Sequence, residues 1–191
     1  MISNVTLDAE ALYRALRDHV QGMLSAASGS ASDSGSGGAP WSIAGIYSGG
    51  AWIAERLAAD LQLPHHGVIN VAFHRDDYAK KGLHSQAQPS TLPFSVQDSQ
   101  VLLIDDVLAT GRTIRAAVNE LFDYGRPARV ALATLVDRGG RELPIAADFV
   151  GERITLPRGT NLVLSREGEG AGIRFSFATE TLNGNHDSAA G

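Results

Sequence analysis

Two adjacent carboxylates followed by a small, hydroxyl-bearing turn are the residues of this chain best suited to chemistry. Asp105 and Asp106 come directly after an apolar run, and an Ala-Thr-Gly-Arg-Thr turn begins three positions later. Hydroxyls and unhindered backbone N–H groups at the start of a helix can bind an anion such as phosphate. Neighbouring carboxylates can accept hydrogen bonds from the vicinal hydroxyls of a ribose. The pattern therefore indicates a sugar phosphate, and the turn consists of Ala109, Thr110, Gly111, Arg112 and Thr113.

The elements that must position these residues predict an α/β protein. Apolar runs that end in polar turns alternate with segments of helical spacing, which is typical of a doubly wound, mostly parallel sheet. In such sheets ligands bind at the carboxyl ends of the strands, where the polar turns of this chain fall. The predicted strands are 41–47, 68–74, 101–105, 130–136 and the shorter 149–150, 161–164 and 173–177, and the predicted helices are 8–23, 51–61 and 113–124.

The chain length favours a single domain, which we expect to cover residues 1–178. Residues 25–40 are almost purely Ser, Gly and Ala and cannot bury enough surface to order themselves, so they predict a flexible insertion in a surface connection. Residues 75–100 form a long polar loop, and such loops in compact domains often act as lids. Residues 179–191 are expected to be a disordered tail.

The composition excludes several classes of protein. With 16 basic and 21 acidic residues the net charge is −5, which argues against a general nucleic-acid binder. The absence of cysteine excludes disulfides, thiolate zinc sites and a cysteine nucleophile. No apolar run approaches the length of about 18 residues needed to cross a bilayer, and no secretory signal is visible. We therefore expect a cytoplasmic protein without a membrane partner.

Three segments resemble known proteins. The string VLLIDDVLATGRT, residues 101–113, resembles the phosphoribosyl-diphosphate signature of the type I phosphoribosyltransferases. Residues 69–81 and 125–151 resemble the pyrimidine-operon regulators that are also uracil phosphoribosyltransferases. Together these segments cover about a quarter of the chain. The resemblance implies the type I fold with a small hood, and a Mg²⁺-assisted reaction of uracil with phosphoribosyl diphosphate that gives UMP and diphosphate.

The resemblance also implies roles for the first site. Asp105 and Asp106 would hold the ribose and offset the positive charge that develops as the C1–oxygen bond breaks. The turn 109–113 would bind the 5′-phosphate. Mg²⁺ prefers oxygen ligands and keeps several waters, so it can be carried by the diphosphate and ribose without a dedicated set of protein ligands.

The same resemblance implies binding roles for three other groups of residues, and each group also has a purely structural interpretation. The turn of Ser48, Gly49 and Gly50 would bind the diphosphate through its backbone, although it also suits an ordinary strand-to-helix connection. Cations in the long loop would pair with the diphosphate on closure, unless the loop is simply a solvated charged segment. The segment that begins the hood would receive the base, or its charges would form a strand-end ion pair. The loop cations are Arg75, Lys80 and Lys81, and the hood residues are Val136, Asp137 and Arg138.

Two positions depart from related patterns. Relatives typically have Thr-Arg where this chain has Ser48 and Gly49, which puts one diphosphate contact in question. Purine-salvage enzymes have an aspartate placed to act on the purine at the position of Ala109, so a purine substrate is disfavoured here.

The leading hypothesis is therefore a uracil phosphoribosyltransferase, with two alternatives. The first alternative is a UMP-responsive RNA-binding attenuator, whose relatives carry several basic residues in the first helix. The second is a sensor that binds the sugar phosphate without efficient turnover, which only Gly49 supports. Because relatives associate, we expect a homo-oligomer. The first helix mixes both signs of charge, which favours catalysis over RNA binding: Arg14, Arg17 and His19 lie beside Asp8, Glu10 and Asp18.

Overall fold

A parallel sheet with helices on both faces organises the chain. The computed structural model describes residues 7–29, 40–71, 89–157 and 159–181. Its five-stranded sheet has the order β2-β1-β3-β4-β5 with every pair parallel, which confirms the predicted doubly wound α/β class. The strands are β1 (Trp41–Ile46), β2 (Gly67–Ile69), β3 (Gln100–Leu108), β4 (Arg129–Asp137) and β5 (Phe149–Arg153).

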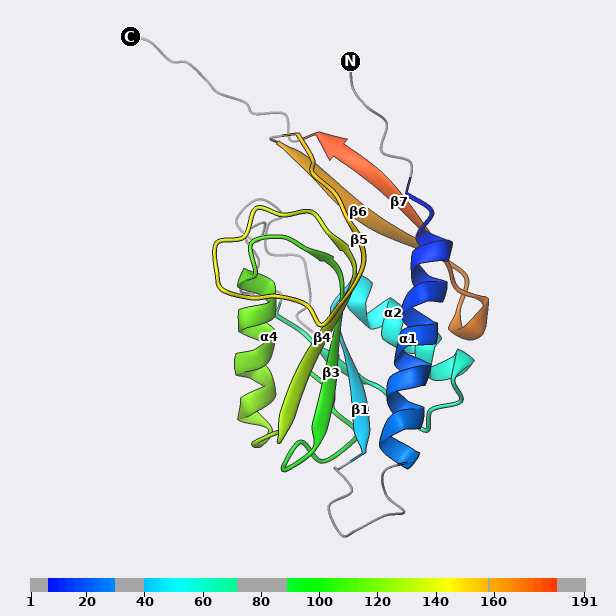
Figure 1. Ribbon diagram of the computed structural model, residues 1–191, viewed down its shortest axis with the longest axis vertical. Helices are drawn as coiled ribbons and strands as arrows, with labels where there is room; N and C mark the ends of the chain where they lie inside the picture. Colours follow the sequence, from blue (N-terminus) through cyan, green and yellow to red (C-terminus); the bar gives the residue numbers. More distant parts are fainter. Residues whose placement is uncertain (1–6, 30–39, 72–88, 158, 182–191) are drawn as a thin grey trace.

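The helices form a layer on each side of the sheet (Figure 1). Helices α1 (Ala9–Gly29) and α2 (Gly49–Asp60) cover one face, and α4 (Arg112–Asp123) covers the other. A separate antiparallel pair, β6 (Thr160–Glu167) and β7 (Arg174–Thr181), packs against α1 and α2, and a short 3₁₀ helix, η3 (Gly170–Gly172), joins its strands.

Strand β3 is buried on both faces, which explains its continuous apolar run. Val101 and Leu103 pack in the cluster under α4, whereas Leu102 and Ile104 pack in the cluster under α1 and α2. All four side chains are at most 2% exposed, and they hold β3 at the centre of the sheet. The strand order reverses between β1 and β3, so the carboxyl ends of these two strands flank the crevice where open sheets bind ligands.

Several element boundaries differ from those predicted. Strand β3 does not end at Asp105 but continues to Leu108, because it stays paired with β4 up to the match of Leu108 with Asp137. Helix α1 continues past Met23 to Gly29, since Met23 and Leu24 pack against the core and let the helix propagate. The insertion predicted to start at Ser25 is therefore helical up to Gly29, and its residues 30–39 lie outside the described residues.

The second and last strands also differ from the predictions. Strand β2 comprises Gly67–Ile69, whereas 68–74 was predicted; residues 70 and 71 are not in the strand, and 72–74 lie outside the described residues. Strand β7 extends to Thr181 because its last residue pairs with Thr160, so the predicted tail does not begin at 179. Residues 182–191 lie outside the described residues.

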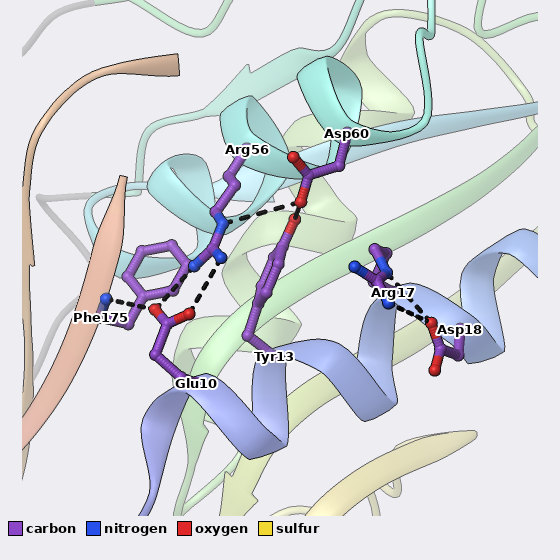
Figure 2. Close-up of polar contacts among 7 residues, drawn as sticks. All are labelled: Glu10, Tyr13, Arg17, Asp18, Arg56, Asp60 and Phe175. Carbon is purple, nitrogen blue, oxygen red and sulfur yellow. Dashed lines mark hydrogen bonds and ion pairs between the residues drawn. The ribbon is translucent and has the colours of Figure 1, made fainter. Parts of the chain in front are cut away.

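An ion-pair cluster joins α1, α2 and β7 (Figure 2). The guanidinium of Arg56 on α2 donates two hydrogen bonds, of 2.7 and 2.9 Å, to the carboxylate of Glu10 on α1. That carboxylate also accepts the backbone N–H of Phe175 on β7 at 2.8 Å. The guanidinium lies 3.9 Å from the centroid of the Tyr13 ring, and the Tyr13 hydroxyl donates to Asp60 at 2.7 Å. We call these five residues the α2 clamp.

The electrostatics of the α2 clamp keep Glu10 ionised and Tyr13 neutral. The hydrogen bond from Arg56 holds the pKa of Glu10 below its ordinary value, against the opposing effect of partial burial. Burial and the hydrogen bond to Asp60 raise the pKa of the Tyr13 hydroxyl. The clamp therefore fixes α2 from one side, while the first turn of the same helix reaches the carboxyl ends of β1 and β3.

We predict that Arg56→Met lowers the free energy of unfolding by about 3 kcal/mol, because it leaves the mostly buried Glu10 carboxylate without its ion-pair partner. Urea unfolding measures this change. Arg166→Met is the matched control, since Arg166 pairs with Glu55 at a more exposed position, and it should cost less than about 1 kcal/mol. Equal losses in the two variants would contradict a stabilising role specific to the clamp.

Candidate active site

The two adjacent acids of β3 have different surroundings. Asp105 is 3% exposed, and one of its carboxylate oxygens accepts the backbone N–H of Asp106 at 3.1 Å. Asp106 is half-buried and points to the opposite face, as alternation along a strand requires. The backbone carbonyl of Asp106 lies 3.1 Å from the hydroxyl of Thr134 on β4. Asp106 is therefore the member of the pair whose carboxylate is available to a ligand.

The predicted diphosphate turn is the beginning of α2. Ser48 is the N-cap, and Gly49 and Gly50 are the first helical residues, both buried. A Cβ added to Gly49 would lie 2.5 Å from the Asp106 carboxylate, and one added to Gly50 would lie 2.1 Å from the carbonyl oxygen of Ile104. The helix start thus touches β3 directly. A side chain at position 49 would have to displace the Asp106 carboxylate.

The predicted phosphate turn connects β3 to α4. Gly111 has a φ of 91°, a left-handed conformation that glycine adopts without strain, and it is the N-cap of α4. The Arg112 backbone N–H donates to the Thr110 hydroxyl at 3.2 Å. The Arg112 guanidinium donates to Glu142 at 2.8 Å, so its charge is directed to that side chain. We call residues 109–113 the phosphate loop.

The hood segment, residues 137–145, begins at the last residue of β4 and packs beside the phosphate loop. The Asp137 carboxylate accepts hydrogen bonds from the Gly139 N–H at 3.0 Å and from the Arg141 guanidinium at 2.6 Å. Burial raises the pKa of Asp137, but these two donors outweigh it and hold the pKa below its ordinary value. Arg138 donates to the carbonyl of Thr160 on β6 at 3.0 Å. Asp137 is therefore an anion already engaged by the protein.

The structure brings most, but not all, of the predicted site residues together. The carboxyl end of β1, the carboxyl end of β3 and the hood segment meet at one edge of the sheet. The Val136 side chain is fully buried in the core under α1 and α2, so it does not line this edge. Arg75, Lys80 and Lys81 lie outside the described residues, and their role in a lid stays a prediction.

Sequence reasoning missed Arg141 and Glu142, which contact the phosphate loop from the hood segment. The Arg141 guanidinium donates to the carbonyl of Ala109, and Glu142 pairs with Arg112 at 2.7 Å. The only signal in the sequence was their position shortly after a strand-end aspartate, in a polar turn that resembles any solvated loop.

A hollow of about 690 Å³ lies at the opposite, amino edge of the sheet. Its walls include Trp41, Gln100, Arg129 and Asp148, and none of the predicted site residues within the described ranges contributes to them.

Comparison with known proteins decides the family. The sequence profile of the phosphoribosyl transferase domain matches residues 9–158. The chain belongs to that family. A bifunctional protein PyrR of Ralstonia nicotianae is 61% identical over 174 residues, which cover 91% of this chain and 95% of the relative. A bifunctional protein PyrR of Pseudomonas aeruginosa PAO1 is 53% identical over 116 residues, which cover 60% of this chain and 68% of the relative. The resemblance to the type I phosphoribosyltransferases of the PyrR family is therefore confirmed.

Solved structures agree with this phosphoribosyltransferase fold. The hypoxanthine phosphoribosyltransferase of Trypanosoma cruzi, in complex with the product IMP, superposes with a TM-score of 0.56 at 19% identity, covering 81% of this chain and 78% of that enzyme. At this identity the likeness shows the fold alone. Among the helices of the described ranges, none is both long and apolar enough to span a membrane.

We predict that Gly49→Ala lowers phosphoribosyl transfer at least about tenfold, because the new methyl group must displace the Asp106 carboxylate and small displacements of reacting groups are costly. Steady-state turnover measures the loss, and urea unfolding shows that the variant is folded. Gly22→Ala is the control: a Cβ there meets nothing within 4 Å, and turnover should be unchanged. Full activity of Gly49→Ala would show that the contact with Asp106 does not matter.

Proposed function

We propose that this protein transfers the phosphoribosyl group of phosphoribosyl diphosphate to uracil, giving UMP and diphosphate. The observation that carries the proposal is the position of the Asp106 carboxylate, directly against the first residue of α2 and three positions before the phosphate loop. A ribose held by Asp106 has its 5′-phosphate near the phosphate loop and its leaving group near the start of α2. Membership of the PyrR family supports uracil as the base.

The residues supply what the reaction requires. Breaking the bond between C1 and the diphosphate oxygen leaves positive charge on the sugar, which the Asp106 carboxylate offsets. Buried Asp105 orients the backbone of Asp106 through its hydrogen bond. The N–H groups at the start of α2, around Gly49 and Gly50, and the positive end of the helix dipole stabilise the negative charge of the departing diphosphate.

Mg²⁺ is the proposed cofactor, and the donor set fits it. Asp106 at this edge of β3 is half-buried, and its carboxylate oxygens are the ligand type that Mg²⁺ prefers. When bound, the ion would neutralise charge on the diphosphate. Among the described residues, no group of three or more His, Asp or Glu side chains is arranged around a common metal position.

Uracil is favoured over a purine by two features of the site. The position where purine-salvage enzymes have an aspartate placed to act on the purine is occupied by Ala109. The nearby Asp137 already accepts hydrogen bonds from Gly139 and Arg141, so its carboxylate is not a free proton acceptor for a base. We propose that backbone groups at the end of β4 recognise the edge of uracil.

We predict UMP formation from uracil, phosphoribosyl diphosphate and Mg²⁺, and no comparable turnover of hypoxanthine or guanine. Asp106→Asn should lower turnover by about 100-fold, because it removes the charge that offsets the cationic sugar. Asp123→Asn, at the exposed end of α4, is the matched control and should retain full activity. Turnover of another base with none of uracil would refute the substrate. Binding of phosphoribosyl diphosphate without any turnover would support a sensor.

Regulation through RNA is the second candidate, because the PyrR relatives are named bifunctional. The exposed surface of α1 offers little net positive charge for an RNA backbone. Arg14 is exposed, but Arg17 donates hydrogen bonds of 3.0 and 2.8 Å to the neighbouring Asp18. The favoured function of the site is therefore catalysis, with UMP-responsive RNA binding as an additional activity to be tested.

An electrophoretic mobility shift with the leader RNA of the chain's own pyrimidine operon tests this additional activity. We expect no shift at physiological salt, since specific RNA binding needs several uncompensated basic contacts. A shift that strengthens with UMP and weakens with added salt would contradict this expectation and establish the attenuator.

A further inference from the structure

The hood segment holds the backbone of the phosphate loop from one side. The Leu108 carbonyl at the end of β3 accepts the N–H of Arg138 at 3.0 Å. The Thr110 carbonyl accepts the N–H groups of Glu142 and Leu143 at 2.9 and 3.1 Å. These hydrogen bonds orient the peptide group between Leu108 and Ala109 and the one between Thr110 and Gly111.

The carbonyl of Ala109, between those of Leu108 and Thr110, is held by a side chain. It accepts a hydrogen bond from the Arg141 guanidinium, which at the same time donates to the Asp137 carboxylate at 2.6 Å. The Asp137 and Arg141 side chains are only 13% and 25% exposed, so water competes weakly for this pair. Three consecutive carbonyls, of Leu108, Ala109 and Thr110, are thus turned toward the hood segment.

The planarity of the peptide bond gives these contacts a consequence for anion binding. In a trans peptide the N–H of the next residue points opposite to the carbonyl. The N–H groups of Ala109, Thr110 and Gly111 therefore point away from the hood segment, and within the described ranges no residue accepts a hydrogen bond from them. A row of N–H groups directed to one side, at the start of a helix, matches the three oxygens of a terminal phosphate.

We propose that Arg141 is a positioning residue that holds the phosphate loop in its anion-binding orientation and links it to Asp137 on the base side of the site. The proposal rests on the phosphoribosyl-transfer function but not on the identity of the base. The Arg141 guanidinium has several N–H donors, so it can bind Asp137 and the Ala109 carbonyl at once. By holding that carbonyl it orients the peptide group between Ala109 and Thr110.

The test measures the affinity for phosphoribosyl diphosphate with Mg²⁺ and without base by titration calorimetry. Arg141→Met should raise the dissociation constant about tenfold, the loss expected for one charged hydrogen bond. Amide hydrogen exchange at Glu142 and Leu143, whose N–H groups donate to the Thr110 carbonyl, should also become faster in the unliganded protein. Arg126→Met is the matched control, because Arg126 donates to a backbone carbonyl at the far end of α4, and it should change neither measurement.

Arg141→Lys separates position from charge. A lysine keeps the positive charge but lacks the planar fork that spans Asp137 and the Ala109 carbonyl, so the dissociation constant should stay at least about threefold above that of the unchanged protein. Unchanged affinity in Arg141→Met, or full recovery in Arg141→Lys, would overturn the proposal. Failure of uracil turnover alone would refute only the base, whereas a protein that binds no phosphoribosyl diphosphate would refute the phosphate loop and this proposal together.

Discussion

The close approach of α2 to the sheet is the constraint on which the site depends. A Cβ at Gly45 would lie 2.2 Å from the carbonyl oxygen of Gly50, and a Cβ at Gly50 would lie 2.1 Å from that of Ile104. Only hydrogen atoms at these positions let the start of the helix touch β1 and β3. The same approach places Gly49 against Asp106, so an acidic group lies beside the positive end of a helix.

The rest of the molecule keeps that approach in place from different directions. On one side the α2 clamp ties α2 to α1 and β7 through Arg56 and Glu10. On the other side the central strand β3 is locked between two apolar clusters, so the register that presents Asp106 cannot slip without exposing its core residues. The packing of α2 and β3 therefore fixes the positions of the polar groups at the strand ends.

The sequence predicted the elements better than the contacts between them. The apolar run 101–104 and the alternation of strands and helices were sufficient for the doubly wound fold. The same run did not reveal that β3 continues to Leu108, because the pairing with β4 that extends it is a non-local interaction. Helix α1 was longer than its polar composition suggested for the same reason, since the packing of Met23 and Leu24 lies outside any local pattern.

The candidate site shows the same limit at the level of single residues. Adjacent acids indicated a ribose site, but only the fold distinguishes buried Asp105 from accessible Asp106. Glu10 meets Phe175 across a separation of 165 positions, and Arg141 meets Ala109 across 32. Neither contact has a sequence motif, because each depends on how distant elements are brought together.

The continuation of β3 beyond its two acids limits which segments can be exchanged between homologous proteins. The carbonyls of Leu108, Ala109 and Thr110, at the end of this extension and just after it, all accept hydrogen bonds from the chain after β4. A chimera that takes 105–113 from one homologue and 137–145 from another would combine two halves of a single interface. Because these two stretches share one set of hydrogen bonds, substitutions in one are expected to be tolerated only with compensating changes in the other.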